Sequence, residues 1–264
     1  MFKKMRRFIP IILVVLAVSS CKYEKLLKSR DYKLKYHKAL DYYADEDYMR
    51  AEGLFEQLKP VLRGTVQADT VYFYAAYCSF NQKSYLLASH YFDEFKKYYG
   101  NSPFVEEAEF MNAYSMYYLS PKPSLDQTYS YQTIALLGLY MSRYPNSERT
   151  DQCINIIEEL KNKLIEKSFQ SAKLYYNLGD YKAAIIALNN SIEEFPATKY
   201  REDMFYLVLK SKFLLAEGSV IGKKTERYQS MVDEYYAFSG EFSESNYIQE
   251  AKDMFDIANS KLKN

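Results

Sequence analysis

The sequence predicts an all-α protein: a right-handed α-solenoid of about five helical hairpins with a C-terminal capping helix. Glycine and proline are rare, with 8 and 7 among 264 residues, and no segment alternates apolar and polar residues as a half-buried strand does. In residues 168–198, small side chains at Ala172 and Ala184 mark the crossing of two antiparallel helices, which Gly179-Asp180 separates. One hairpin cannot bury its own apolar face, so further hairpins are expected.

The hairpin at 168–198 approximates the tetratricopeptide pattern of roughly 34 residues, with Ala184 and Leu188 in the A-x3-F positions and Pro196 at its end. The tyrosine that opens the second helix of this hairpin recurs along the chain. These tyrosines are Tyr48, Tyr85, Tyr131, Tyr181 and Tyr228. Their spacings of 37, 46, 50 and 47 residues exceed the ideal repeat, so we expect lengthened helices or inserted loops.

The expected helices follow from this pattern in chain order. The first hairpin is expected at residues 25–44 and 48–62, and the second at residues 69–80 and 85–99. The fifth is expected at residues 201–216 and 225–238, and the capping helix at residues 243–262. Residues 147–177 contain no proline or glycine, and Ser147 is a suitable N-cap. These 31 residues would form one helix roughly 46 Å long, shared by hairpins three and four. We therefore divide the mature chain into residues 21–146, with hairpins one to three, and residues 147–264.

Residues 1–20 have the features of a bacterial signal peptide. Four basic residues within the first eight precede a short apolar stretch at 9–18, which is too short to span a membrane. The order Val18-Ser19-Ser20-Cys21 resembles a lipobox, in which the cysteine becomes the lipidated first residue of the mature chain. Cys21 is therefore the predicted lipidation site, and several acyl chains on it would anchor the protein stably.

The charge of the mature chain argues against a nucleic-acid partner. Without residues 1–20, it has 31 basic and 34 acidic residues, a net charge of −3, and no basic stripe that would neutralise phosphates. No spacing typical of catalytic, metal-binding or phosphate-binding motifs occurs, so we expect no enzyme activity, no metal and no cofactor. Cys78 and Cys153 lie in apolar helical patterns, and we interpret both as buried small hydrophobic residues.

A protein-binding surface has more support. Alignment of the hairpins with the repeat template places a set of apolar and aromatic residues on the inner face of the first helices. They are Tyr36, Leu40, Tyr43, Phe73, Tyr77, Phe80, Phe110, Tyr114 and Tyr117. A concave surface of this kind would bind an extended or helical peptide with apolar side chains, whereas packing of neighbouring hairpins would bury the same rings as core.

Several short segments carry a family resemblance. They are RYPNS (143–147), LKNKL (160–164), AKLYY (172–176), GDYKAAI (179–185) and FPAT (195–198). Together with the lipobox, they resemble the BamD family, the lipoprotein subunits of the β-barrel assembly machinery of the outer membrane. The abundance of tyrosine, at 29 residues, is similar to members of the Bacteroidetes type.

The resemblance implies a non-enzymatic scaffold on the periplasmic face of the outer membrane. Its C-terminal half would dock on a periplasmic domain of the barrel subunit BamA, and its N-terminal half would receive unfolded outer-membrane proteins. Relatives often carry an arginine six residues after the position of Tyr181, where this chain has Ala187. Docking would then use other residues, and Asn189 and Asn190 are the candidates.

Two other binding functions are compatible with helical hairpins. A periplasmic tetratricopeptide adaptor that coordinates peptidoglycan synthesis or cell division is the main alternative, although such proteins usually lack a lipobox. A carbohydrate-capturing lipoprotein would need a longer chain with large insertions between hairpins.

Overall fold

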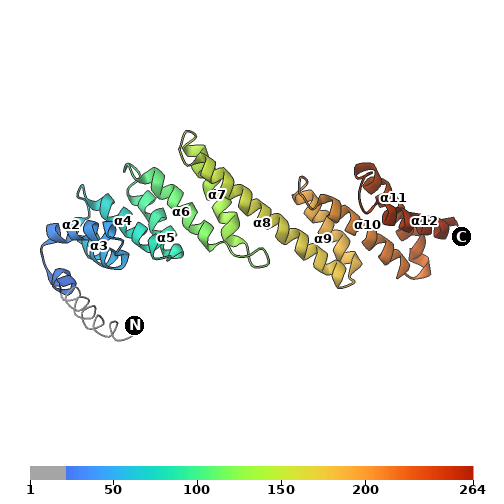
Figure 1. Cartoon of the computed structure of the whole chain (residues 1–264), viewed down its shortest axis with the longest axis horizontal. Coiled ribbons are helices and arrows are strands. Elements are labelled where there is room, and N and C mark those ends of the chain that lie inside the picture. Colours follow the sequence, from blue (N-terminus) through green and yellow to red (C-terminus); the bar gives the residue numbers. More distant parts are fainter. Residues whose placement is uncertain (1–21, 264) are drawn as a thin grey trace, which may run out of the picture. The chain divides into compact units, whose positions relative to one another are not determined.

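The computed structural model describes residues 22–263, which consist of helices and their connecting turns and contain no strand (Figure 1). A helical segment at residues 22–28 comes first. The helices that follow are α2 (Tyr32–Ala44), α3 (Tyr48–Leu62), α4 (Ala68–Asn81), α5 (Tyr85–Tyr98), α6 (Val105–Leu119), α7 (Thr128–Arg143), α8 (Thr150–Asn177), α9 (Tyr181–Glu194), α10 (Arg201–Glu217), α11 (Ile221–Glu241) and α12 (Ile248–Lys263). The predicted all-α fold of successive hairpins is confirmed.

The chain forms two compact units. Unit 1 contains the described residues up to Pro121 together with Thr128–Ile157, and unit 2 contains Lys122–Gln127 and the described residues from Glu158 onward. The boundary therefore falls inside α8. Within unit 1, each helix from α2 to α7 packs on the next, and within unit 2 the same holds from α9 to α12.

The repeated pattern specifies the cores of most hairpins. Three positions after the repeated tyrosines lie fully buried residues: Ala51, Ala88, Ala184 and Met231. Four positions further on, the large side chains of Phe55, Phe92 and Leu188 are fully buried as well. Small residues let two helices approach closely, and the large residue one turn later fills the space beside the crossing.

The predicted register of the third hairpin is wrong by one residue. Tyr131 is exposed on α7, and the helix instead buries Ser130, Thr133, Leu137 and Tyr140. A shift by one residue rotates the contact stripe by about 100° around the helix. Seven residues after Tyr131, the repeat template expects a core residue at Gly138, which is exposed, and Leu137 is buried instead. The same rotation lets the Tyr140 hydroxyl pair with Ser147 at 2.7 Å.

Several predicted helix boundaries also change: α11 begins at Ile221 instead of Thr225, and α12 begins at Ile248 instead of Ser243. Two further changes follow from local hydrogen bonding. The expected helix at 25–44 is interrupted, because the Asp31 carboxylate accepts from Leu34 N at 2.9 Å and starts α2 at Tyr32. The long helix begins at Thr150 rather than Ser147, because the Ser147 hydroxyl donates to Glu106 at 2.6 Å. The 28 residues of α8 still form a helix roughly 42 Å long.

The end of unit 2 has the features of a cap. Helix α12 buries Ala251, Met254 and Ala258, which lie on one face at spacings of three and four residues, and Lys252 and Asp253 are exposed. Elsewhere, Cys78 and Cys153 are buried free thiols, as interpreted from the sequence.

Candidate protein-binding site

The nine candidate groove residues are distributed over the first helices of the hairpins in unit 1, three each on α2, α4 and α6. Seven of them are partly exposed: Tyr36, Leu40, Tyr43, Tyr77, Phe80, Tyr114 and Tyr117. The other two are core residues, with Phe73 only 6% and Phe110 only 1% exposed. Phe73 and Phe110 therefore support the surface from beneath instead of lining it, because helices α5 and α7 pack over their rings. The seven partly exposed residues are called the aromatic face below.

The aromatic face is continuous between α4 and α6. The ring of Phe80 stacks on Tyr114 at a centroid distance of 5.8 Å, and the hydroxyls of Tyr114 and Tyr118 are hydrogen-bonded at 3.1 Å. Tyr85 from α5 stacks on Tyr118 at 4.6 Å. Tyr118 was not among the predicted residues, although its position one turn after Tyr114 on the same helix face indicated it.

At the other end of the aromatic face, Tyr43 connects α2 with α4. Its ring meets Tyr74 edge-on at 4.7 Å and Tyr48 at 5.5 Å. Burial raises the pKa of Tyr43 to about 12. Edge-to-face pairs of this type are attractive beyond simple apolar burial, and they hold the rings in one orientation.

A cluster of partly exposed polar side chains lies beside the aromatic face. The Tyr77 hydroxyl donates to Glu107 Oε1 at 2.6 Å, and Arg149 donates to both oxygens of the same carboxylate, at 2.7 and 3.3 Å. The guanidinium of Arg149 also lies over the Phe110 ring at 4.5 Å. Burial, and then the hydrogen bond to Glu107, raise the pKa of Tyr77. We call Tyr77, Glu107 and Arg149 the polar node.

The polar node was not predicted from the sequence. Its two charged partners are 42 residues apart, and nothing in the local pattern links them. A bidentate carboxylate–guanidinium pair has fixed geometry, so the node attaches the residues before α8 firmly to α6.

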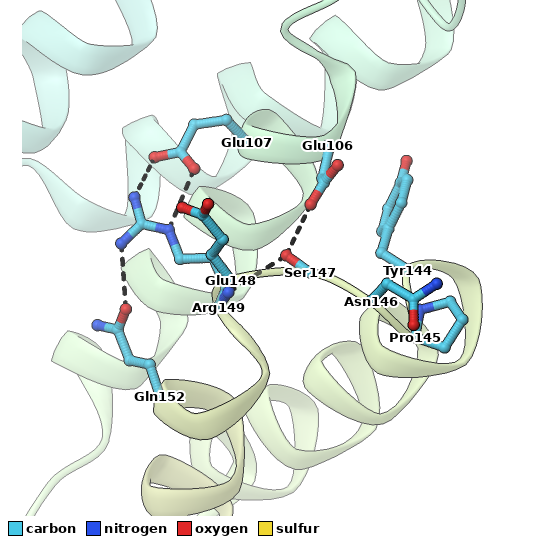
Figure 2. A pocket seen from close by; sticks show the side chains of 9 residues that line it. All are labelled: Glu106, Glu107, Tyr144, Pro145, Asn146, Ser147, Glu148, Arg149 and Gln152. Atoms are coloured by element: carbon cyan, nitrogen blue, oxygen red, sulfur yellow. Dashed lines mark hydrogen bonds and ion pairs between the residues drawn. The ribbon is translucent and has the colours of Figure 1, made fainter.

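The polar node borders a pocket of about 760 Å³, which Figure 2 shows with its side chains. Its other lining residues are Glu106, Tyr144, Pro145, Asn146, Ser147, Glu148 and Gln152. Most of the polar groups drawn are already paired, for example Arg149 with Gln152 at 3.1 Å. The pocket walls carry three carboxylates and one guanidinium, which suits recognition of amide or cationic groups of a polypeptide. Within residues 22–263, no group of side chains has the composition of a metal site.

The remaining predicted sites belong to other parts of the chain. Asn190 on α9 is exposed and Asn189 is partly exposed, and both are in unit 2. Cys21 lies outside the described residues. In the part of the chain that the structure describes, no helix is long and apolar enough to cross a bilayer.

Comparison with known protein families establishes the family of this chain. A family model described as "outer membrane lipoprotein", YfiO, matches residues 29–226, which is about three quarters of the chain. The chain belongs to the BamD (YfiO) family. The match includes the helices that carry the aromatic face and the polar node, so these features of the chain lie within the family's shared region.

Two curated BamD proteins are similar in sequence. The putative outer membrane protein assembly factor BamD of Aquifex aeolicus is 25% identical over 227 residues, covering 85% of this chain and 74% of the relative. The outer membrane protein assembly factor BamD of Helicobacter pylori is 39% identical over 66 residues, covering 25% of this chain and 30% of the relative. The latter match thus spans less than a third of that relative's length.

Solved tetratricopeptide structures are similar only distantly. The TPR2AB domain of yeast Sti1 in its complex with pHSP90 gives a TM-score of 0.40 at 12% identity, covering 86% of this chain and 98% of that chain. The TPR domain of P58(IPK) gives 0.42 at 14% identity, covering 91% and 68%.

Proposed function

We propose that this BamD-family chain is a non-enzymatic lipoprotein scaffold in the assembly of outer-membrane β-barrel proteins. The observation that carries the proposal is the family match over residues 29–226, together with relatives named as outer membrane protein assembly factors. The lipid on Cys21 holds the scaffold on the periplasmic face of the outer membrane. No cofactor takes part, and the work of the protein is to bring other proteins together.

In this proposal, unfolded outer-membrane proteins bind to unit 1. Their membrane-facing strands alternate apolar side chains with polar ones, and the apolar side chains fit between the rings of the aromatic face. Rings that already stack on one another lose little conformational entropy on binding, and this favours affinity. The carboxylate of Glu148, which lines the pocket beside the polar node, accepts hydrogen bonds from unpaired backbone N–H groups of the same client.

Unit 2 docks on a periplasmic domain of a BamA-like barrel subunit. Helix α9 offers a surface for it, because Ile186 is 55% exposed and Asn190 follows one turn later on the same face. An exposed large aliphatic residue beside amides is typical of a modest protein interface. Ala187 carries no charge, so it cannot form an ion pair at the position where related chains often carry arginine.

The test of the proposal is co-purification from detergent-solubilised outer membranes. A tagged, lipidated chain is expected to recover a BamA-like subunit, and trapped unfolded barrel proteins after crosslinking. Recovery of a peptidoglycan synthase or a division protein without a barrel subunit would instead establish the adaptor function and refute our proposal.

The client-binding role predicts the effect of a double variant on the aromatic face. Phe80→Ala with Tyr114→Ala removes a stacked pair, and we expect at least about tenfold weaker crosslinking of a peptide from a barrel strand, equivalent to ~1.4 kcal/mol. Circular dichroism checks that helicity is retained. The matched control, Tyr98→Ala with Tyr131→Ala, removes two exposed rings elsewhere in unit 1 and should leave crosslinking unchanged. Equal crosslinking by both variants would show that Phe80 and Tyr114 do not bind the client.

A further inference from the structure

The helical segment at residues 22–28 is packed against the first hairpin. The Tyr23 hydroxyl donates to the backbone carbonyl of Arg50 at 3.1 Å, and its ring meets Tyr42 edge-on at 5.7 Å. Leu26 and Leu27 add apolar contacts to the core of this hairpin. A Cβ atom on residue 53 would lie 2.5 Å from the Tyr23 hydroxyl, so Gly53 is what allows this close approach.

A buried lysine donates a hydrogen bond to the C-terminal end of the same segment. Lys35 is only 3% exposed, and its ammonium donates to the carbonyl of Leu27 at 2.9 Å and to Gln57 Oε1 at 2.6 Å. Lysine is almost never this buried unless its charge is paired with acceptors. The two bonds tie the carbonyl end of the segment to both α2 and α3, since Lys35 belongs to α2 and Gln57 to α3.

This packing leaves no free linker between the proposed lipid and the fold. Cys21 is bonded directly to Lys22, and consecutive Cα atoms are about 3.8 Å apart. Tyr23 is already in contact with the hairpin. A lipid on Cys21 would therefore bring the first hairpin within a few residues' length of the bilayer surface.

The surface at this end of the chain is basic. Five exposed cations lie between residues 22 and 33: Lys22, Lys25, Lys28, Arg30 and Lys33. None of the five forms an ion pair within the described residues, and this stretch holds only two acidic residues, which gives it a net charge of +3. The remainder of the chain from residue 34 carries 26 basic and 32 acidic residues, a net charge of −6. We call the five cations the basic N-terminal face.

Two exposed apolar residues adjoin these cations. Tyr32 is 40% and Leu34 is 44% exposed at the start of α2. Tyrosine is enriched at the membrane–water boundary, where its ring meets acyl chains and its hydroxyl stays wet, and lysine stems can reach headgroups beside it. Each basic residue close to an anionic bilayer adds attraction within a Debye length of about 8–10 Å.

We infer that the first hairpin lies directly on the bilayer, with the basic N-terminal face against the phosphates of anionic phospholipid headgroups. The inference rests on the proposed lipid anchor at Cys21. The anchor supplies the local concentration, and the cations and Tyr32 then orient the hairpin. The first hairpin therefore has a defined orientation relative to the bilayer and does not rotate freely about the lipid anchor.

The experiment uses the lipidated full chain in vesicles of phosphatidylethanolamine and phosphatidylglycerol. Because the chain contains no tryptophan, Tyr32→Trp creates a single fluorescent reporter on the proposed contact, and Tyr98→Trp creates a reference elsewhere in unit 1. Phospholipids with a nitroxide on the headgroup quench tryptophan only at contact. We expect strong quenching of the reporter at position 32 and little at position 98.

A charge-reversal set tests the cause of the contact. Lys25→Glu, Lys28→Glu and Arg30→Glu together should lower quenching at position 32 to the level seen at position 98. The matched control, Lys252→Glu, Lys261→Glu and Lys263→Glu, changes the net charge equally on exposed residues of α12 and should have no effect. Molar salt should also lower quenching at position 32 in the protein without charge reversal, because it shortens the Debye length to about 3 Å. This test needs no charge substitution that could disturb folding.

Flotation of the vesicles separates the two proposals. If the protein floats but the reporter at position 32 is quenched no more than the one at position 98, the inference is overturned and the anchor stands. If quenching is strong but insensitive to reversal and to salt, contact with headgroup phosphates is likewise overturned. A protein that does not float overturns the lipid anchor itself, and the orientation with it.

Discussion

Replacing Phe92 with alanine is expected to lower the free energy of unfolding of unit 1 by about 3–5 kcal/mol. Phe92 is fully buried on α5, and its ring meets Phe73 at 6.2 Å and Tyr77 at 5.2 Å. Alanine would leave a cavity between α4 and α5 that rigid neighbouring helices fill only in part. Loss of the Phe92 ring should also let the Tyr77 ring move, so client crosslinking should weaken along with stability.

The measurement is urea unfolding followed by circular dichroism, with hydrogen exchange to locate the loss. Exchange is needed because arrays of hairpins unfold in parts, and a single transition cannot be assumed. Leu86→Ala on the same helix is the control: this residue is 57% exposed, and its replacement should change stability by about 0.5 kcal/mol or less. A loss below about 1 kcal/mol for Phe92→Ala would mean that the α4–α5 core is not packed as described.

Placing charges on α9 is expected to abolish co-purification with the BamA-like subunit. Ile186→Glu with Asn190→Glu would bury two unpaired carboxylates in the proposed interface, at a cost of about 2–5 kcal/mol, which lowers affinity by a factor of about 25 or more. Both residues are at the surface of unit 2, so the fold should tolerate the changes. The readout is the amount of barrel subunit recovered per tagged chain from solubilised membranes.

The chain offers a control with the same residue types. Ile154→Glu with Asn155→Glu places identical charges on exposed positions of α8 within unit 1. Full recovery from this control and none from the α9 variant would support docking through α9. Undiminished recovery from the α9 variant would rule that helix out as the contact, and Asn189 and Asn190 with it.

Much of the fold could be predicted from local patterns. The alanines at 51, 88 and 184 and the large residues four positions later recur at fixed distances from a tyrosine, and each of these residues is fully buried. Helix pairing between neighbours in the chain depends on such short-range periodicity, so the hairpins could be recognised without coordinates. The family resemblance also rested on contiguous segments, and the family match bears it out.

The details that decide the candidate site were not predictable in the same way. Which side of a helix is covered depends on its rotation against neighbours that are distant in the chain. For this reason Phe73 and Phe110 proved to be core, and α7 turned out to be rotated by one residue. The polar node joins Glu107 to Arg149 across 42 residues, and no local pattern encodes that distance.

By itself, the amino-acid sequence determined the helical hairpins and the family, and it predicts a signal peptide with lipidation at Cys21. Each of these depends on residues that are close together in the chain. Only the tertiary structure decided which aromatic rings reach the surface, which carboxylate binds the Tyr77 hydroxyl, and that residues 22–28 are held against the first hairpin by Lys35. Those outcomes depend on contacts between distant segments, whose energies are settled only when the helices are packed together.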